Sequence, residues 1–330
     1  MRARAVGREV MLTRIGLGVA QFGNLYRETT DEEAAGAFQA AWDGGVRYFD
    51  TAPHYGLGLS ERRLGRLLRD RRRDSYALST KVGRLLEPNP DGQGRMDDEG
   101  FVVPATLRRR LDYSADGVKR SLESSLTRLG VDRIDIVYIH DPDEHWRDAS
   151  ELAVPALVEL RDQGVIGAVG VGMNQSAMLA EFVRRCDVDV VMLAGRYTLL
   201  DQRAQSDLLP LALQRGVGVV AAGVYNSGLL ARDRPSADAH YEYETAGAEL
   251  VDRATRIAEL CEQHGCTLPE AAIAFPLRHP AVVSAVLGAR NARQSQTNIA
   301  RSQAVVPDAL WAALADSGLV PEAALTLGDK

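Results

Sequence analysis

The stretch GGVRYFDTAPHYGLGLSERRLGRLL (residues 44–68) contains one complete structural unit of the chain. Its run of β-branched and aromatic residues at 46–50 predicts a buried strand. A segment with helical spacing of apolar residues precedes this strand at residues 31–43, and the glycine pair between them is typical of a helix end. A second helix is predicted at residues 60–69. Together, the stretch and the segment before it predict a strand between two helices that face a common core.

The same alternation of strand and helix repeats along the chain. Strands are predicted at residues 15–19, 46–50, 77–81, 134–140, 165–171, 188–193, 217–221 and 282–287. Helices are predicted at residues 31–43, 60–69, 114–129, 153–162, 176–184, 202–214, 249–264, 268–277 and 291–302. Repeated βα units imply parallel strands, and eight of them suit a closed (β/α)8 TIM barrel of the α/β class. A doubly wound open sheet is the alternative.

Three segments lie outside this repeat. Residues 3–12, with Gly7 in the middle, predict a β-hairpin that could close the bottom of the barrel. Residues 84–113 and 225–248 form long connections, which are usually functional loops. A length of 330 residues would also allow two domains, but neither connection resembles a linker, so a single domain over residues 1–330 is expected.

Composition excludes several classes of protein. The chain is 45% hydrophobic and 25% charged with a net charge of −6, which argues against disorder and against a nucleic-acid or membrane partner. No apolar run reaches about 18 residues, and the N-terminus lacks the apolar stretch of a signal peptide. Three cysteines are too few for a disulfide framework. A cytoplasmic protein is expected, and its oligomeric state is left open.

Two familiar binding motifs are incomplete. Gly16 and Gly18, and again Gly216 and Gly218, begin the glycine pattern of a Rossmann turn, but the third glycine is missing in both places. The segment HDPDEH (residues 140–145) contains ligand-type residues without a zinc-binding spacing. Neither a Rossmann domain nor a bound metal is therefore expected.

Four polar residues lie at or just beyond the carboxyl ends of successive strands: Asp50, Tyr55, Lys81 and His140. In a barrel these ends converge on one face. The set suits proton transfer to or from a carbonyl or alcohol oxygen, because a lysine ammonium lowers the pKa of a nearby tyrosine from about 10. Asp50 would orient Lys81, and His140 would donate a hydrogen bond to the substrate oxygen.

The opening stretch at residues 44–68 also resembles the signature of the aldo-keto reductases. STKVG (residues 79–83), the strand that ends in His140 and GVGMNQ (residues 170–175) match that family in order and spacing. The resemblance covers residues 17–300 and implies a barrel that binds a nicotinamide dinucleotide in extended form. It also implies a catalytic tetrad of Asp50, Tyr55, Lys81 and His140.

The resemblance further implies the residues that hold the cofactor. Asn174 matches the asparagine that binds the nicotinamide carboxamide. The pyrophosphate loop corresponds to Asn226, Ser227, Gly228 and Leu229, where exposed backbone N–H groups suit phosphate oxygens. The adenosine end corresponds to Gly288, Arg290, Gln294 and Asn298. Arg290 would contact the 2′-phosphate of NADP, so the cofactor is NADP(H) or NAD(H), with NADP favoured.

The chain departs from the family pattern around the nicotinamide. Met173 replaces the usual serine, and Ala194 replaces the usual glutamine. Ala222 stands where the family usually has the aromatic residue that stacks on the nicotinamide. Tyr225 or Met173 would have to compensate for its loss.

Three further segments are similar to one branch of the family. They are GVAQFGNLY (residues 18–26), LAGRYTLLDQ (residues 193–202) and VYNSGLLA (residues 224–231). This branch contains aldose 1-dehydrogenases and pyridoxal 4-dehydrogenase, which oxidise a cyclic hemiacetal to a lactone. The resemblance therefore implies a small carbonyl or sugar substrate.

The residues expected to contact the substrate are aromatic or imidazole side chains near the mouth of the barrel: Phe22, Tyr26, His54 and Trp146. Two other functions remain open at this point. One is an NADPH-dependent aldehyde or ketone reductase, for example in natural-product biosynthesis. The other is a cofactor-binding regulatory subunit, like the potassium-channel β-subunits of the same family.

Overall fold

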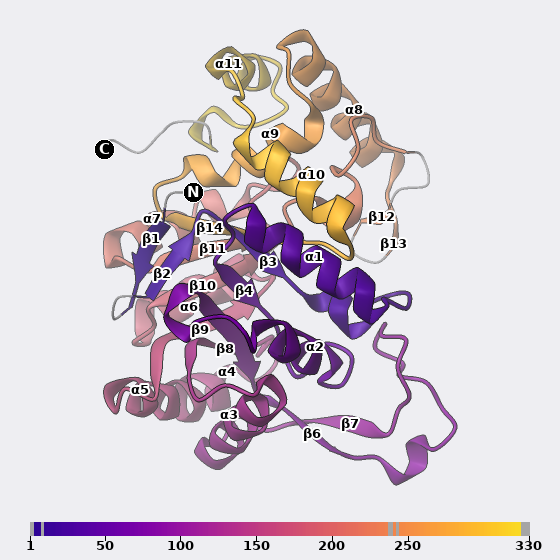
Figure 1. Cartoon of the computed structure of the whole chain (residues 1–330). Helices are drawn as coiled ribbons and strands as arrows, with labels where there is room; N and C mark the ends of the chain where they lie inside the picture. Colours follow the sequence, from indigo (N-terminus) through magenta and orange to yellow (C-terminus); the bar gives the residue numbers. More distant parts are fainter. Residues whose placement is uncertain (1–2, 8–9, 237–239, 242–243, 325–330) are drawn as a thin grey trace.

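The computed structural model describes residues 3–7, 10–236, 240–241 and 244–324. Its centre is a closed barrel of parallel strands in the order β10-β11-β14-β3-β4-β5-β8-β9 (Figure 1). The strands are β3 (Ile15–Gly18), β4 (Tyr48–Asp50), β5 (Ala77–Val82), β8 (Ile134–His140), β9 (Ile166–Met173), β10 (Val190–Ala194), β11 (Gly218–Ala222) and β14 (Val282–Gly288). The expected α/β barrel is confirmed, and the open sheet is excluded because the strand order closes on itself.

Helices surround this barrel (Figure 1). They are α1 (Asp31–Asp43), α2 (Leu59–Leu68), α3 (Ala115–Leu129), α4 (Trp146–Asp148), α5 (Val154–Asp162), α6 (Ser176–Arg185), α7 (Leu208–Arg215), α8 (Ala248–Gln263), α9 (Leu268–Ala274), α10 (Ala292–Gln303) and α11 (Asp308–Asp316). A capping box between Thr30 and Glu33 starts α1 at the predicted residue, because each side chain accepts a hydrogen bond from the other's backbone N–H.

Two helices differ from their predicted bounds by more than one residue, for local reasons. Arg203–Gln205 forms a separate 3₁₀ turn, and α7 begins only after Asp207, whose side chain accepts a hydrogen bond from Leu208 N. Pro276 begins another 3₁₀ turn just after α9, because proline has no N–H to continue the helical hydrogen bonds. Helix α11 has no counterpart among the predicted helices.

The connection predicted as a loop at residues 84–113 contains an antiparallel hairpin instead. Its strands are β6 (Arg84–Pro88) and β7 (Leu107–Leu111). The segment between them is fixed to the rim of the barrel, since Tyr26 N donates to Gly100 O at 2.8 Å. Phe101 is 3% exposed in a small apolar cluster there. The other long connection contains the two-residue strands β12 (His240–Tyr241) and β13 (Glu244–Thr245).

A second hairpin closes the opposite end of the barrel, as predicted. Its strands are β1 (Ala3–Val6) and β2 (Val10–Thr13). The alternate side chains Val6, Val10 and Leu12 are buried in one cluster with Tyr48 and Ile136 from inside the barrel. Gly7 lies in the turn with a φ of 52°, which favours glycine. Burial of each such apolar side chain contributes roughly 1.5–3 kcal/mol.

This packing generates a stability prediction. Leu12→Ala should lower the free energy of unfolding by about 2–5 kcal/mol, because Leu12 is fully buried at the hairpin–barrel contact. The matched control is Met11→Ala on the same strand, where the side chain is 51% exposed and a change within about 0.5 kcal/mol is expected. Chemical denaturation measures both. Equal destabilisation by the two variants would contradict the hairpin's role as a plug.

Candidate active site

Asp50 and Lys81 form a buried ion pair at the carboxyl ends of neighbouring strands β4 and β5. Lys81 Nζ lies 2.7 Å from Asp50 Oδ2 and also donates to Thr51 O at 2.9 Å. Both side chains are almost fully buried. Ser79 donates to the other oxygen of Asp50 at 2.7 Å, so the carboxylate is held from two sides.

The carboxylate keeps the lysine charged. Burial alone would lower the pKa of Lys81, but the interactions with Asp50 and Tyr55 together outweigh it and raise the pKa above its ordinary value. A positive charge is therefore fixed at the bottom of the site at neutral pH.

Tyr55 lies over this charge in the turn after β4. Lys81 Nζ is 4.8 Å from the centroid of the Tyr55 ring. The position of the turn depends on a close backbone approach: a Cβ added at Gly23 would lie 2.5 Å from the carbonyl carbon of Tyr55. Gly56, the next residue, has a φ of 62° and faces Gly23. Two glycines thus fix where the phenol lies.

The protonation of Tyr55 differs from the prediction. Burial raises the pKa of Tyr55, and the nearby Lys81 ammonium lowers it by less, so the net shift is upward from the ordinary value of about 10. The predicted effect of Lys81 is present, but the predicted direction of the net shift was wrong, because the loss of water around the phenol outweighs the effect of Lys81. Tyr55 is therefore a protonated acid at neutral pH.

His140 completes the group at the end of β8. Its ring stands nearly perpendicular to that of Tyr55, with 5.9 Å between the centroids. Burial, followed by the charges of Lys81 and Arg84, lowers the pKa of His140 well below 6.5. A neutral imidazole can donate one hydrogen bond to an oxygen without carrying a charge.

These four side chains border one cavity of about 250 Å³. The structure therefore brings together all four residues of the expected tetrad. Hydrophobic side chains from the ends of three other strands, Met173, Met192 and Ala222, border the same cavity. The remaining polar lining comes from Gln21 and Asp141, neither of which was predicted as a site residue.

None of the four residues expected to contact the substrate is among the described residues that line this cavity. Phe22 is fully buried in the main hydrophobic core. Trp146 packs against Phe182 at a centroid distance of 4.5 Å, and Tyr26 is 62% exposed. The structure does not place these three side chains in the cavity, because a position near a strand end does not specify which way a side chain points.

His54, the fourth of these residues, packs against His140 of the tetrad. Its ring centroid is 5.6 Å from that of His140 and 5.1 Å from that of Phe101. Burial and the charges of Arg109 and Arg84 lower the pKa of His54 to about 3, so it is a neutral neighbour of the site.

A second cavity of about 280 Å³ adjoins the first at Ala194 and Gly223. Its lining includes Asn174, Asn226 and Ser227, which were expected to hold the cofactor. Asn226 Nδ2 donates to Gly195 O at 3.3 Å, while its buried Oδ1 has no hydrogen-bond partner among the described residues.

Two backbone N–H groups of the expected pyrophosphate loop are less available to bind phosphate oxygens than predicted. Gly228 N donates to Tyr225 O at 3.0 Å, and Leu229 N donates to Asn226 O at 3.1 Å. Their N–H groups are therefore already used within the turn, and the expectation that they are exposed is corrected. Ser227, which is exposed with a φ of 56°, presents the loop's outer surface.

The residues expected at the adenosine end bond to one another and to the barrel rim. Arg290, 8% exposed, donates to Leu25 O at 2.6 Å, to Arg27 O at 3.0 Å and to the Thr29 hydroxyl. Its guanidinium is therefore committed to the loop before α1, so Arg290 gives no reason to favour NADP.

The other adenosine-end residues are held in the same way. Gln294 Oε1 accepts from Arg290 N at 2.7 Å, and Asn298 Nδ2 donates to Gly288 O at 3.1 Å. Tyr225 donates to Asn298 Oδ1 at 3.0 Å. Tyr225 therefore lies at this end and outside the described lining of the 250 Å³ cavity, whereas Met173 borders that cavity. Met173 is the residue that could replace the missing stacking aromatic.

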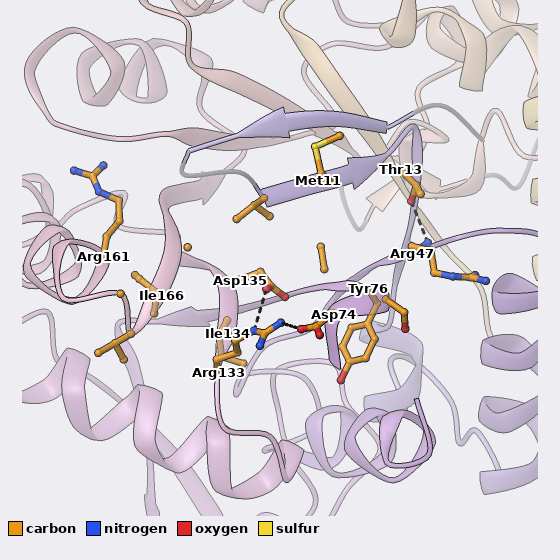
Figure 2. A pocket seen from close by; sticks show the side chains of 16 residues that line it. Met11, Thr13, Arg47, Asp74, Tyr76, Arg133, Ile134, Asp135, Arg161 and Ile166 are labelled. Atoms are coloured by element: carbon orange, nitrogen blue, oxygen red, sulfur yellow. Dashed lines mark hydrogen bonds and ion pairs between the residues drawn. The ribbon is translucent and has the colours of Figure 1, made fainter. Parts of the chain in front are cut away.

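A larger cavity of about 790 Å³ lies at the other end of the barrel, between the β1–β2 hairpin and the starts of β5, β8 and β9 (Figure 2). Two of its charged groups form an ion pair: Arg133 Nη2 lies 2.6 Å from Asp74 Oδ1. The tetrad residues belong to the opposite end, so volume alone does not identify the reactive site. Within the described ranges, no cluster of potential metal ligands is found, and no helix is long and apolar enough to cross a membrane.

Comparison with known proteins identifies the relatives of this site. Residues 14–317 match the aldo/keto reductase family. The chain is 46% identical over 320 residues to a D-threo-aldose 1-dehydrogenase from Pseudomonas sp., covering 96% of this chain and 97% of the relative. It is 38% identical over 335 residues to a pyridoxal 4-dehydrogenase from Microbacterium luteolum, with the same coverage.

Solved structures agree with this assignment. An aldo-keto reductase from Bacillus halodurans, determined in its holo form, superposes with a TM-score of 0.71 at 26% identity. The superposition covers 93% of this chain and 92% of the other.

The close approach at Gly23 generates a prediction about turnover. Gly23→Ala should displace the Tyr55–Gly56 peptide and lower kcat by roughly 10- to 100-fold, since small misplacements of reacting groups are costly. Gly247→Ala is the control, because an added Cβ there meets no atom within 4 Å. Steady-state kinetics on folded protein measure both variants. Unchanged kcat in Gly23→Ala would show that this contact does not position Tyr55.

Proposed function

Because this chain belongs to the aldo/keto reductase family, we propose that it oxidises the anomeric carbon of a cyclic hemiacetal, an aldose or pyridoxal, to a lactone. Family membership makes the chain an oxidoreductase that uses a nicotinamide cofactor. The observation that carries the proposal is the convergence of Tyr55, Lys81 and His140 on a cavity of about 250 Å³. This cavity adjoins the 280 Å³ cavity at Ala194 and Gly223, so the two together offer space for a small ring beside a nicotinamide.

The residues beside the tetrad fit a dinucleotide. The second cavity offers an exposed amide at Asn174 and an unpartnered buried acceptor at Asn226 Oδ1, which suits a hydroxyl donor. Met173 and Ala222 would provide an apolar surface for the nicotinamide ring. When bound, the nicotinamide supplies the hydride acceptor for oxidation, or the donor for reduction.

The tetrad would move the proton. In oxidation, the anomeric hydroxyl gives its proton to the Tyr55 phenolate while the carbon–oxygen bond becomes a carbonyl. The Lys81 ammonium stabilises the phenolate, and Asp50 keeps Lys81 charged and oriented. Neutral His140 donates a hydrogen bond to the reacting oxygen and so favours one approach of the substrate.

Reduction of an aldehyde or ketone is the second candidate. The upward-shifted pKa of Tyr55 favours it, because a protonated phenol is the acid that an emerging alkoxide requires. The phenolate needed for oxidation becomes more abundant as pH rises, so oxidation is favoured under alkaline conditions.

For the cofactor, we favour NAD over NADP. Arg290 is already bonded to the loop before α1, and its neighbours Gly288 and Gln294 carry no charge to pair with a 2′-phosphate. NAD requires no such pairing.

Activity assays test the proposed function. Wild-type protein should oxidise L-fucose, D-arabinose or pyridoxal, with a higher kcat/KM for NAD than for NADP. Tyr55→Phe should abolish turnover but leave NAD binding intact, because only the transferable proton is lost. Tyr76→Phe, which alters a tyrosine at the opposite end of the barrel, is the control. Reduction of simple aldehydes without oxidation of any of the three substrates would favour the reductase instead.

A further inference from the structure

We propose that Asp141 determines specificity by accepting a hydrogen bond from a hydroxyl group next to the reacting carbon of a polyhydroxylated substrate. This inference rests on the proposed function, since it names the substrate class of the same site. Asp141 directly follows His140 and borders the 250 Å³ cavity. It lies outside the tetrad.

The carboxylate of Asp141 is held beside the group that binds the reacting oxygen. Its Oδ2 lies 3.5 Å from His140 Nε2 and accepts a hydrogen bond from Arg84 Nη2 at 3.1 Å. Among the described residues, Oδ1 has no hydrogen-bond partner. A substrate whose oxygen contacts His140 would therefore bring its neighbouring substituent close to Oδ1.

Arg84 is the positioning residue for this carboxylate. It is the first residue of β6, and its guanidinium also lies 3.5 Å from Glu99 on the same hairpin. The hairpin thus places the Arg84 guanidinium at the rim of the barrel, where it holds the Asp141 carboxylate. Burial raises the pKa of Asp141, and the charge of Arg84 opposes that shift and favours the carboxylate form.

The backbone at Asp141 is consistent with a functional constraint. Its φ of 41° lies in the left-handed region, which residues other than glycine rarely adopt. Such conformations persist at sites where the surroundings enforce them. Asp141 borders the cavity, and its Oδ1 is an acceptor that a sugar hydroxyl can use and a simple aldehyde cannot.

The test uses a matched pair of open-chain aldehydes, glyceraldehyde and propanal, reduced with NADH. Wild-type protein should prefer glyceraldehyde by roughly 10- to 100-fold in kcat/KM, the size expected for one hydrogen bond to a charged group. Asp141→Asn should reduce this preference by a similar factor, with the larger loss of kcat/KM falling on glyceraldehyde. Asparagine is nearly isosteric and tolerates the left-handed backbone, so the fold should persist.

Glu144→Gln is the control, because it removes an exposed carboxylate from the same loop. It should leave the preference unchanged. Equal losses on both aldehydes in Asp141→Asn would overturn the proposal, because Asp141 would then act through His140. No preference for glyceraldehyde in wild-type protein would also overturn it, whether or not the variant folds. Because these assays run in the reducing direction, failure to oxidise any lactol would refute the proposed function separately.

Discussion

The buried pair between Lys81 and Asp50 is the interaction on which the site depends. An ammonium placed in the interior is costly unless a carboxylate and further hydrogen bonds compensate for lost water. Strand register supplies this compensation. Asp50 pairs with Ser79 across β4 and β5, and Lys81, two residues further on, points to the same side of the sheet. A chain of hydrogen-bonded hydroxyl groups extends from this pair into the barrel. Ser79 Oγ lies 3.1 Å from the Tyr48 hydroxyl, which lies 3.1 Å from the Tyr138 hydroxyl.

The two ends of the barrel have different roles. Apolar side chains of the β1–β2 hairpin seal the end where strands begin, and the cavity there is bordered by the ion pair of Arg133 and Asp74. Reactive groups gather at the other end, where the inserted β6–β7 hairpin adds Arg84 and Phe101 around the tetrad. Stability and chemistry are thereby separated along the barrel axis, as is general for this architecture.

Much of the fold could be predicted from hydrophobic spacing, because eight buried strands and their helices repeat one pattern. Strand β8 has the predicted bounds, and α1 begins where its capping box requires. The hairpin at residues 84–111 could not be recognised, since arginines interrupt its alternation and its partners are distant in sequence. Similarly, strand ends identified the tetrad, whereas Arg290 appears as a free cation until its three acceptors on residues 25–29 are known. Asp141 could have been predicted as a site residue from the sequence, because it directly follows the end of β8.

The central claim is that the buried Lys81 charge partly offsets the upward shift that burial imposes on the pKa of Tyr55. The most direct measurement is a ¹³C NMR titration of ring-labelled tyrosine in wild-type protein and in Lys81→Met, with Tyr55→Phe identifying the signal. The account predicts a midpoint above about 10 in wild-type protein and a still higher one in Lys81→Met, since burial remains and the ammonium is gone. A midpoint that is unchanged or lower in Lys81→Met would contradict it.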